Sequence, residues 1–497
     1  EIKECDWSSD VCSSDLASTH RESVRRRASL ARTVGACAEA PVDEIKRVEK
    51  VKMVRRCLSL VMSALIAGLL GANSASAQQD ALPDLSEPLT LEDCLAIGLD
   101  YASAIRTSTL SLQSSGLQVE DARTTYLPSV QTSGAYLAND RTEIDFEREN
   151  FDWAVTADYT IWDHGRRRIG LAQARDGRDS AAARLERTRQ DLVLDIVQAY
   201  YSLLEGKTLV AFDEDQLEVS RGNAEQIRAM QAVGSRIPAD IAAAEVRVAS
   251  DELALLNDQN SLAFSAARLP TVLGFDPDTI MAVADDRSFP VYRQTGQFAE
   301  YTQTREETIE LALRQRSEIL ESELGLRIQG WSRDRARLQR LPVVTARVNY
   351  GVDLDDYLHE REAFKDFRSW DAMARVTFPI FDGGTTRREL ERAELDIDRS
   401  EEQHAELTRS IGLDVTQSYL NLKEAEKRLR ISAVQVRNAQ LNLDVTTERF
   451  RQDLVIPLEL FDAQTQFGLA NTTQIRAFYG YKIAQHALDR AVGKAVR

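Results

Sequence analysis

The chain has 497 residues, with 62 lysines and arginines against 79 aspartates and glutamates, so its formal net charge is −17. Residues 1–77 hold 12 basic and 10 acidic residues, which leaves 50 basic and 69 acidic residues beyond them and a net charge of −19 there. This acidic balance argues against nucleic acid as a partner.

An export signal is predicted at 53–77. Met53 is followed by a pair of arginines, an apolar core over 58–70 and a small-residue cleavage site that ends at Ala77. We expect the mature chain to begin after Ala77. Residues 1–52 are then a non-native leader, and the alternative is a genuine disordered extension.

Cysteine use limits how the exported chain can be stabilised. Of the five cysteines, only Cys94 follows the predicted cleavage site, and it does not lie directly at that site. A single cysteine builds no internal disulfide framework, and no lipid anchor is indicated. Stability is expected to come from packing or from assembly.

Long helices dominate the predicted secondary structure. The apolar pattern predicts a helix over 91–126 and a longer one over about 166–233, which would reach roughly 100 Å at 1.5 Å per residue. Its apolar positions repeat like a coiled-coil seam: Leu192, Ile196, Ala199, Leu203, Val210 and Leu217. Returning helices complete two long antiparallel hairpins, at 166–269 and 385–492.

Segments of period-two alternation lie between the helices. From Trp153 to Trp162 every second residue is apolar, and the same alternation recurs over 344–350 and 374–380. Aromatic residues gather at the segment ends: Tyr136, Trp153, Trp162, Tyr350, Trp370 and Phe381. Together with the export signal, this predicts β-hairpins at 128–162 and 342–381 that face lipid on one side and water on the other. A solvated antiparallel sheet with one buried face would alternate identically.

The sequence also contains an internal repeat. Three pairs of matching positions share an offset of 219, and two pairs nearer the N-terminus share an offset of 214. These pairs are Ile161 and Ile380, Tyr200 and Tyr419, Pro238 and Pro457, then Pro128 and Pro342, Ile105 and Ile319. The unit is far longer than a solenoid repeat of roughly 20–50 residues. We predict a duplicated half-protein, with repeats over 78–303 and 304–497.

Four strands cannot close a barrel, and open strand edges are not tolerated in lipid. Three copies would supply twelve strands, an even number within the range of known barrels. The predicted fold is therefore mostly α, with long helical hairpins continuous with a twelve-stranded β-barrel formed by a homotrimer.

Four short motifs resemble the TolC family of outer-membrane efflux proteins, and the likeness spans 89–493. They are Leu89-Thr90-Leu91-Glu92, Leu127-Pro128, Ile380-Phe381-Asp382-Gly383-Gly384 and Leu458-Glu459-Leu460-Phe461-Asp462-Ala463-Gln464. The resemblance implies a trimeric duct in the outer membrane of a Gram-negative bacterium, continued through the periplasm by a helical barrel. It also implies a periplasmic adaptor (membrane fusion) protein and an inner-membrane pump as partners. Small-molecule efflux and protein secretion share this fold, so the cargo is not indicated.

The resemblance further implies a periplasmic gate at the hairpin tips. Glu459 and Asp462 match two acidic residues that ring the pore in the family, and their spacing of three puts both on one helix face. Asp240 matches an aspartate used in the family's gate bonds. The alternative is that acidic residues near a helix N-terminus complement the helix dipole.

The family's polar latch is not preserved here. Its arginine and tyrosine match Val455 and Phe450, and Arg449 or Arg451 is a possible replacement. We expect the turns at the tips to contact the adaptor, through Gly234, Pro238, Asp453 and Pro457.

Enzymatic functions are poorly supported. Glu401 and His404 form a single Glu-x-x-His motif, whereas di-iron chemistry needs two such motifs and two further glutamates. The sequence has no P-loop, dinucleotide fingerprint or nucleophile elbow. We expect no catalytic residues, no metal and no cofactor. The second class of function left open is a periplasmic coiled-coil scaffold without a pore.

Overall fold

The computed structural model describes residues 88–139, 148–284, 288–353 and 368–494. These residues belong to one compact unit, from Pro83 to Arg497. The predicted leader, 1–52, and the predicted export signal, 53–77, lie outside the described residues.

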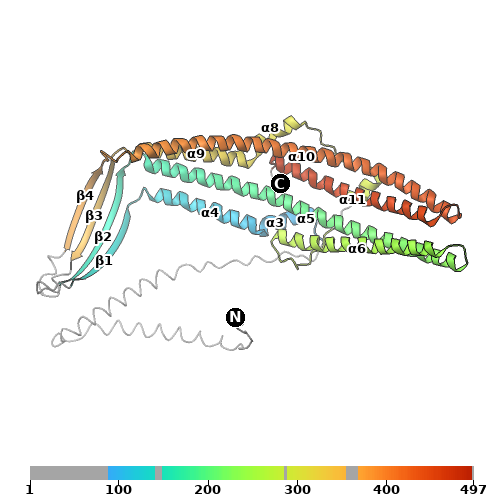
Figure 1. Ribbon diagram of the computed structural model, residues 1–497. Helices are drawn as coiled ribbons and strands as arrows, with labels where there is room; N and C mark the ends of the chain where they lie inside the picture. Colours follow the sequence, from blue (N-terminus) through green and yellow to red (C-terminus); the bar gives the residue numbers. More distant parts are fainter. Residues whose placement is uncertain (1–87, 140–147, 285–287, 354–367, 495–497) are drawn as a thin grey trace, which may run out of the picture. The chain divides into compact units, whose positions relative to one another are not determined.

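The first half of the chain runs through helices, two strands and a long helical hairpin (Figure 1). Its elements are α3 (Leu91–Tyr101), α4 (Ser103–Thr124), β1 (Ser129–Asn139), β2 (Arg148–Trp162), α5 (Arg166–Ala232) and α6 (Pro238–Leu273). The short helix α7 (Ser288–Thr295) follows. The second half comprises α8 (Arg305–Gln315), α9 (Ser317–Leu338), β3 (Val343–Asp353), β4 (Arg368–Thr377), α10 (Thr385–Arg451) and α11 (Pro457–Val492).

The two halves match in element order and in length. Helices α5 and α10 both have 67 residues, α6 and α11 both have 36, and each pair starts 219 positions apart. Threonine caps open the first helix of each half, at Thr90 and Thr304, which are 214 positions apart. In Figure 1, α5 lies beside α6 and α10 lies beside α11, and these two pairs have the most extensive helix contacts.

The helix predicted over 91–126 is wrong in one respect, because it is broken at Ala102. This residue is extended, with φ −61° and ψ 132°, and Arg316 breaks the second half in the same way. Both breaks pack against the glycine that ends a returning helix. A Cβ on Gly274 would lie 2.7 Å from the Tyr101 carbonyl oxygen, and one on Gly493 would lie 3.0 Å from the Arg316 Cα. The break is therefore set by a tertiary contact.

The strands form one antiparallel sheet in the order β1-β2-β3-β4. Apolar residues face apolar ones across the β2–β3 pair, as in Val155 with Tyr350 and Ala157 with Val348. Polar residues alternate with them, and the Arg347 guanidinium forms a 2.6 Å ion pair with Asp158. The predicted alternation is confirmed over 344–350. Strand β4 ends at Thr377, so the alternation predicted to run to Ile380 leaves the sheet before Phe378.

An aspartate begins each long helix after its strand. The Asp163 carboxylate accepts hydrogen bonds from the Gly165 and Arg167 amides, at 3.0 and 2.9 Å. Asp382 accepts from Gly384 and Thr386, both at 2.9 Å. Each carboxylate thus satisfies helix N-terminal donors that would otherwise lack partners.

Most of the buried apolar side chains gather where α3, α5, α6, α7 and α11 meet. Ile196, Leu269, Leu273 and Tyr479 are among the most buried of them. A second, smaller cluster lies near the turns that join the long helices. Among the described residues, no helix is both long enough and apolar enough to cross a membrane.

Candidate functional site

The tips of the two helical hairpins share one backbone geometry. Gly234 in the first tip has φ 84°, and Asp453, 219 positions later, has φ 55°. Gly234 donates its amide proton to Gln231 at 2.9 Å, and Asp453 donates to Phe450 at 3.0 Å. The second tip therefore places a carboxylate side chain where the first tip has none.

An apolar cluster near the tips contains both positions, Phe450 and Val455, at which the resemblance implied a polar latch in the family. Phe450 is 3% exposed and Val455 is 5% exposed. They pack with buried side chains from both hairpins, which include Ala224, Ile227, Ala244, Leu460 and Phe461. The sequence predicted that these two positions hold no polar latch, and in the structure both side chains pack among apolar residues.

An arginine of the first tip, Arg236, links the two tips. The Arg236 guanidinium forms a 2.9 Å ion pair with the Asp453 carboxylate and lies 5.1 Å from the centroid of the Phe450 ring. Its side chain is only 11% exposed, whereas that of Asp453 is 72% exposed. We call Arg236, Phe450 and Asp453 the tip clamp.

Neither arginine named as a possible latch replacement takes this place. The Arg451 guanidinium pairs with Glu448 in its own helix at 3.5 Å. Arg449 contributes its carbonyl oxygen to the turn, where it accepts from the Leu454 amide at 2.9 Å. The repeat offset could have identified Arg236, because 236 and 455 differ by 219 and Val455 is the position at which the resemblance implies a latch arginine.

The three predicted gate carboxylates fall into two kinds. Glu459 and Asp462 are exposed near the start of α11, and neither side chain has a hydrogen-bond or ion-pair partner within the described part of the chain. Asp240 is half-buried near the start of α6 and accepts from the Ile237 amide at 3.4 Å. The Asp240 carboxylate thus caps its own helix, whereas the carboxylates of Glu459 and Asp462 are exposed to solvent.

The tips also expose apolar side chains. Three of the predicted contact residues, Gly234, Pro238 and Asp453, are exposed, whereas Pro457 is buried. Large apolar side chains beside them are more than half exposed: Val233, Ile237, Leu454, Ile456 and Leu458. Exposed apolar groups gathered in this way are typical of an interaction surface.

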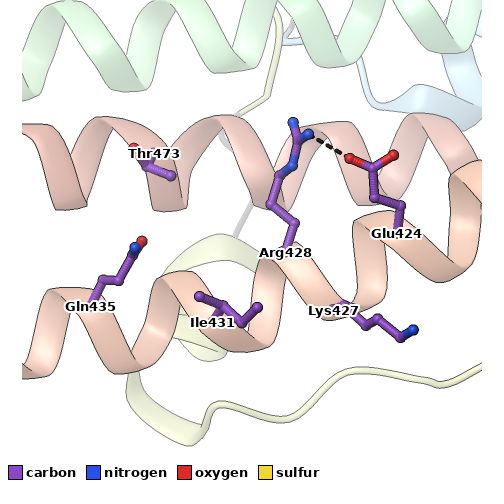
Figure 2. Close-up of a pocket in the computed structure, with 6 residues that line it drawn as sticks. All are labelled: Glu424, Lys427, Arg428, Ile431, Gln435 and Thr473. Carbon is purple, nitrogen blue, oxygen red and sulfur yellow. Dashed lines mark hydrogen bonds and ion pairs between the residues drawn. The ribbon is translucent and has the colours of Figure 1, made fainter.

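A shallow groove of about 420 Å³ lies elsewhere, along α10 and α11 (Figure 2). Its lining residues are Glu424, Lys427, Arg428, Ile431, Gln435 and Thr473. The ion pair in this groove joins Arg428 to Glu424, one turn away in the same helix, at 2.6 Å. Because this pair is local and exposed, it contributes little to stability.

The family model for outer membrane efflux proteins matches residues 99–275 and 308–494, one segment in each half. The chain belongs to the outer membrane efflux protein family. Protein CyaE of Bordetella pertussis is 24% identical over 349 residues, covering 69% of this chain and 71% of CyaE. Outer membrane protein TolC of Vibrio cholerae is 23% identical over 385 residues, covering 76% of this chain and 84% of that protein.

Solved structures give the same fold. The structure of CusC, which forms a transmembrane channel, matches with a TM-score of 0.70 at 15% identity, over 84% of this chain and 95% of that one. The predicted fold class, of long helices with a small antiparallel sheet as in this family of channels, is confirmed. Family membership also confirms the predicted outer-membrane location and the predicted function, an exit duct for efflux or secretion.

Proposed function

We propose that this efflux-family protein works as a homotrimer, in which twelve strands close one barrel in the outer membrane. The observation that carries the proposal is the four-stranded sheet, whose outer strands β1 and β4 each lack a strand partner on one side within the described residues. Unpaired backbone groups are costly in lipid, so these edges call for pairing with other copies. Under this proposal the halves 78–303 and 304–497 each supply two strands to the barrel.

The exposed tips are the proposed docking surface for a periplasmic adaptor, which would connect the duct to an inner-membrane pump. Support comes from the apolar side chains at the tips, among them Val233, Ile237 and Leu454. An apolar patch framed by the polar residues Ser235, Arg236 and Asp453 suits a helical partner with an apolar tip of its own.

The proposed constriction of the duct is formed by Glu459 and Asp462. Both carboxylates are exposed, unpaired within the described residues and one helical turn apart. In a trimer, three copies of each would carry six negative charges around one axis. Like charges held close together attract cations and repel anions.

Planar-bilayer recording of the purified protein tests this proposal. We expect cation-selective conductance and block by multivalent cations, and we expect Glu459→Ala/Asp462→Ala to lose most of both. The matched control is Glu401→Ala/Glu402→Ala, which removes two exposed carboxylates of α10 and should leave both properties unchanged. Wild-type selectivity and block in the Glu459/Asp462 variant would show that these residues do not line the constriction.

A further inference from the structure

The packing between the two hairpins changes character along α11. Apolar side chains dominate near Tyr479 and again near Phe461. Between them, α11 buries Gln464 and Asn471, which are 5% and 2% exposed. This polar stretch of α11 contrasts with the apolar packing on either side of it.

Four carboxylates from the first hairpin line the polar stretch, and we call them the carboxylate cluster. They are Glu205 and Asp213 of α5 and Asp251 and Asp258 of α6. Asp213 is 8% exposed, and its Oδ2 atom is buried without a hydrogen-bond partner among the described residues. Its carboxyl group lies within hydrogen-bonding reach of Asp258. Two carboxyl groups can share such a bond only when one of them carries a proton.

One member of the cluster, Asp251, has a close cation partner. The Asp251 carboxylate accepts from the Arg247 guanidinium at 2.9 Å and from the Ser220 hydroxyl. Arg247 also donates to the Thr465 hydroxyl of α11 at 2.6 Å. Arg247 is therefore engaged by Asp251 and Thr465, and it makes no ion pair with Asp213 or Asp258 among the described residues.

The other cation near the cluster, Arg476 of α11, lies at the outer limit of ion pairing. Its guanidinium is 3.9 Å from Asp258 and 4.0 Å from Glu205, and its side chain is 57% exposed. At these distances and this exposure the pairs are weak. Arg476 is thus close enough to respond to a new negative charge in the cluster, and free enough to move toward it.

Burial raises the pKa of Asp213 to about 7, assisted by the hydrogen bond to Asp258 and by the charges of Asp258 and Asp251, while Arg476 acts in the opposite direction. Below this pH, Asp213 is protonated and can donate its hydrogen bond to Asp258. Above it, the two ionised carboxylates repel each other, and the added charge attracts Arg476.

We propose that Asp213 and Asp258 form a proton-controlled joint, in which loss of one proton exchanges a contact within the first hairpin for a contact with α11. The protonated joint holds α5 to α6 through the carboxyl pair. The ionised joint draws Arg476 inward and ties α11 to the first hairpin. Its effect on conduction rests on the function proposed above, whereas the joint itself does not.

A double-mutant cycle on the full protein in mild detergent tests the joint, with the thermal unfolding midpoint as the readout. At pH 6, Arg476→Gln should shift the midpoint equally in the wild type and in Asp213→Asn. At pH 8, it should lower the midpoint by roughly 2 °C more in the wild type than in Asp213→Asn. Equal shifts at both pH values would overturn the proposal.

Two further variants keep the test decisive. Asp215→Asn removes an exposed carboxylate two residues away and should behave as the wild type. Because Asp213 holds its proton more tightly in the folded protein than in the unfolded chain, the wild-type midpoint should fall between pH 6 and pH 8. Asp258→Asn removes the hydrogen bond and the charge that assist burial in raising the pKa of Asp213, so this fall should become smaller than in the wild type. If Asp213→Asn does not fold, an undiminished fall of the midpoint in Asp258→Asn overturns the joint.

The consequence for the duct is measured separately in planar bilayers. Because the ionised joint ties the hairpins together, the open fraction should be lower at pH 8 than at pH 6, and Asp213→Asn should remove the difference. A pH-dependent coupling in the cycle together with a pH-independent open fraction would refute the regulatory role and leave the joint standing.

Discussion

At the scale of single residues, the tip clamp explains why Asp453 adopts an unusual backbone conformation. A non-glycine residue at φ 55° costs about 1–2 kcal/mol relative to glycine. Gly234 occupies the matching position of the first tip without that cost. The strain at Asp453 coincides with its ion pair to Arg236, so the carboxylate is retained where glycine would fold more easily.

Replacing Asp453 with glycine should weaken closure of the tips while leaving the stability of the protein nearly unchanged. Relief of the left-handed strain offsets the larger entropy of an unfolded glycine, so the unfolding free energy should stay within about 1 kcal/mol of the wild-type value. The resting conductance in planar bilayers should rise several-fold, because Arg236 loses its partner. We expect the same rise for Arg236→Gln.

The control for the tip clamp is Arg451→Gln, which breaks an exposed pair with Glu448 near the same tip. It should leave the resting conductance unchanged. A wild-type resting conductance in Asp453→Gly would show that the clamp does not restrain the tips.

At the scale of elements, the passage from strand to long helix is built alike in both halves. An aspartate carboxylate accepts hydrogen bonds from backbone amides at the start of the helix. The two residues after the aspartate have positive φ, 57° and 90° at His164 and Gly165, and 62° and 79° at Gly383 and Gly384. This turn redirects the chain from the sheet into α5 or α10 without leaving helix donors unsatisfied. The junction is therefore encoded by a short, local motif.

Gly165→Ala should destabilise the protein by about 1–2 kcal/mol, seen as a lower thermal unfolding midpoint in detergent. Apart from the residue itself and its two chain neighbours, no heavy atom lies within 4 Å of the added Cβ, so the cost arises from the backbone conformation. Gly177→Ala in the same helix also meets open space, but its φ is not positive, and it should stabilise by up to about 1 kcal/mol. Equal effects of both substitutions would refute this reading of the junction.

At the scale of the whole molecule, a single protomer leaves apolar surface uncovered. Large apolar side chains are more than half exposed along α6 and α10, among them Val246, Leu253, Phe264, Leu395, Leu413 and Leu441. The outer strands of the sheet are unpaired among the described residues. Both features are unfavourable for an isolated copy, and association would remove both.

We therefore expect a homotrimer that persists in mild detergent. Native mass measurement should give three times the protomer mass, and conductance should be lost in preparations separated into protomers. A stable monomer that still conducts ions would contradict trimeric closure of the barrel.

Local patterns in the sequence were sufficient for much of this architecture. Apolar periodicity predicted both long hairpins, because a helix places every third or fourth residue on one face whatever its neighbours are. Period-two alternation over 344–350 predicted strand β3 for the same reason, and the offset of 219 recurs in the paired helices. These features depend on residues close together in the chain or on the repetition of a pattern, and both can be read directly.

Tertiary structure alone decided the contacts between distant segments. Arg236 reaches Asp453 across 217 positions, and Asp213 of α5 meets Asp258 only because α6 folds back beside it. The break at Ala102 depends on the approach of Gly274, although Ala102 and its neighbours are compatible with a helix. No local pattern records such contacts, because the partner, its distance and its burial exist only once the hairpins have packed together.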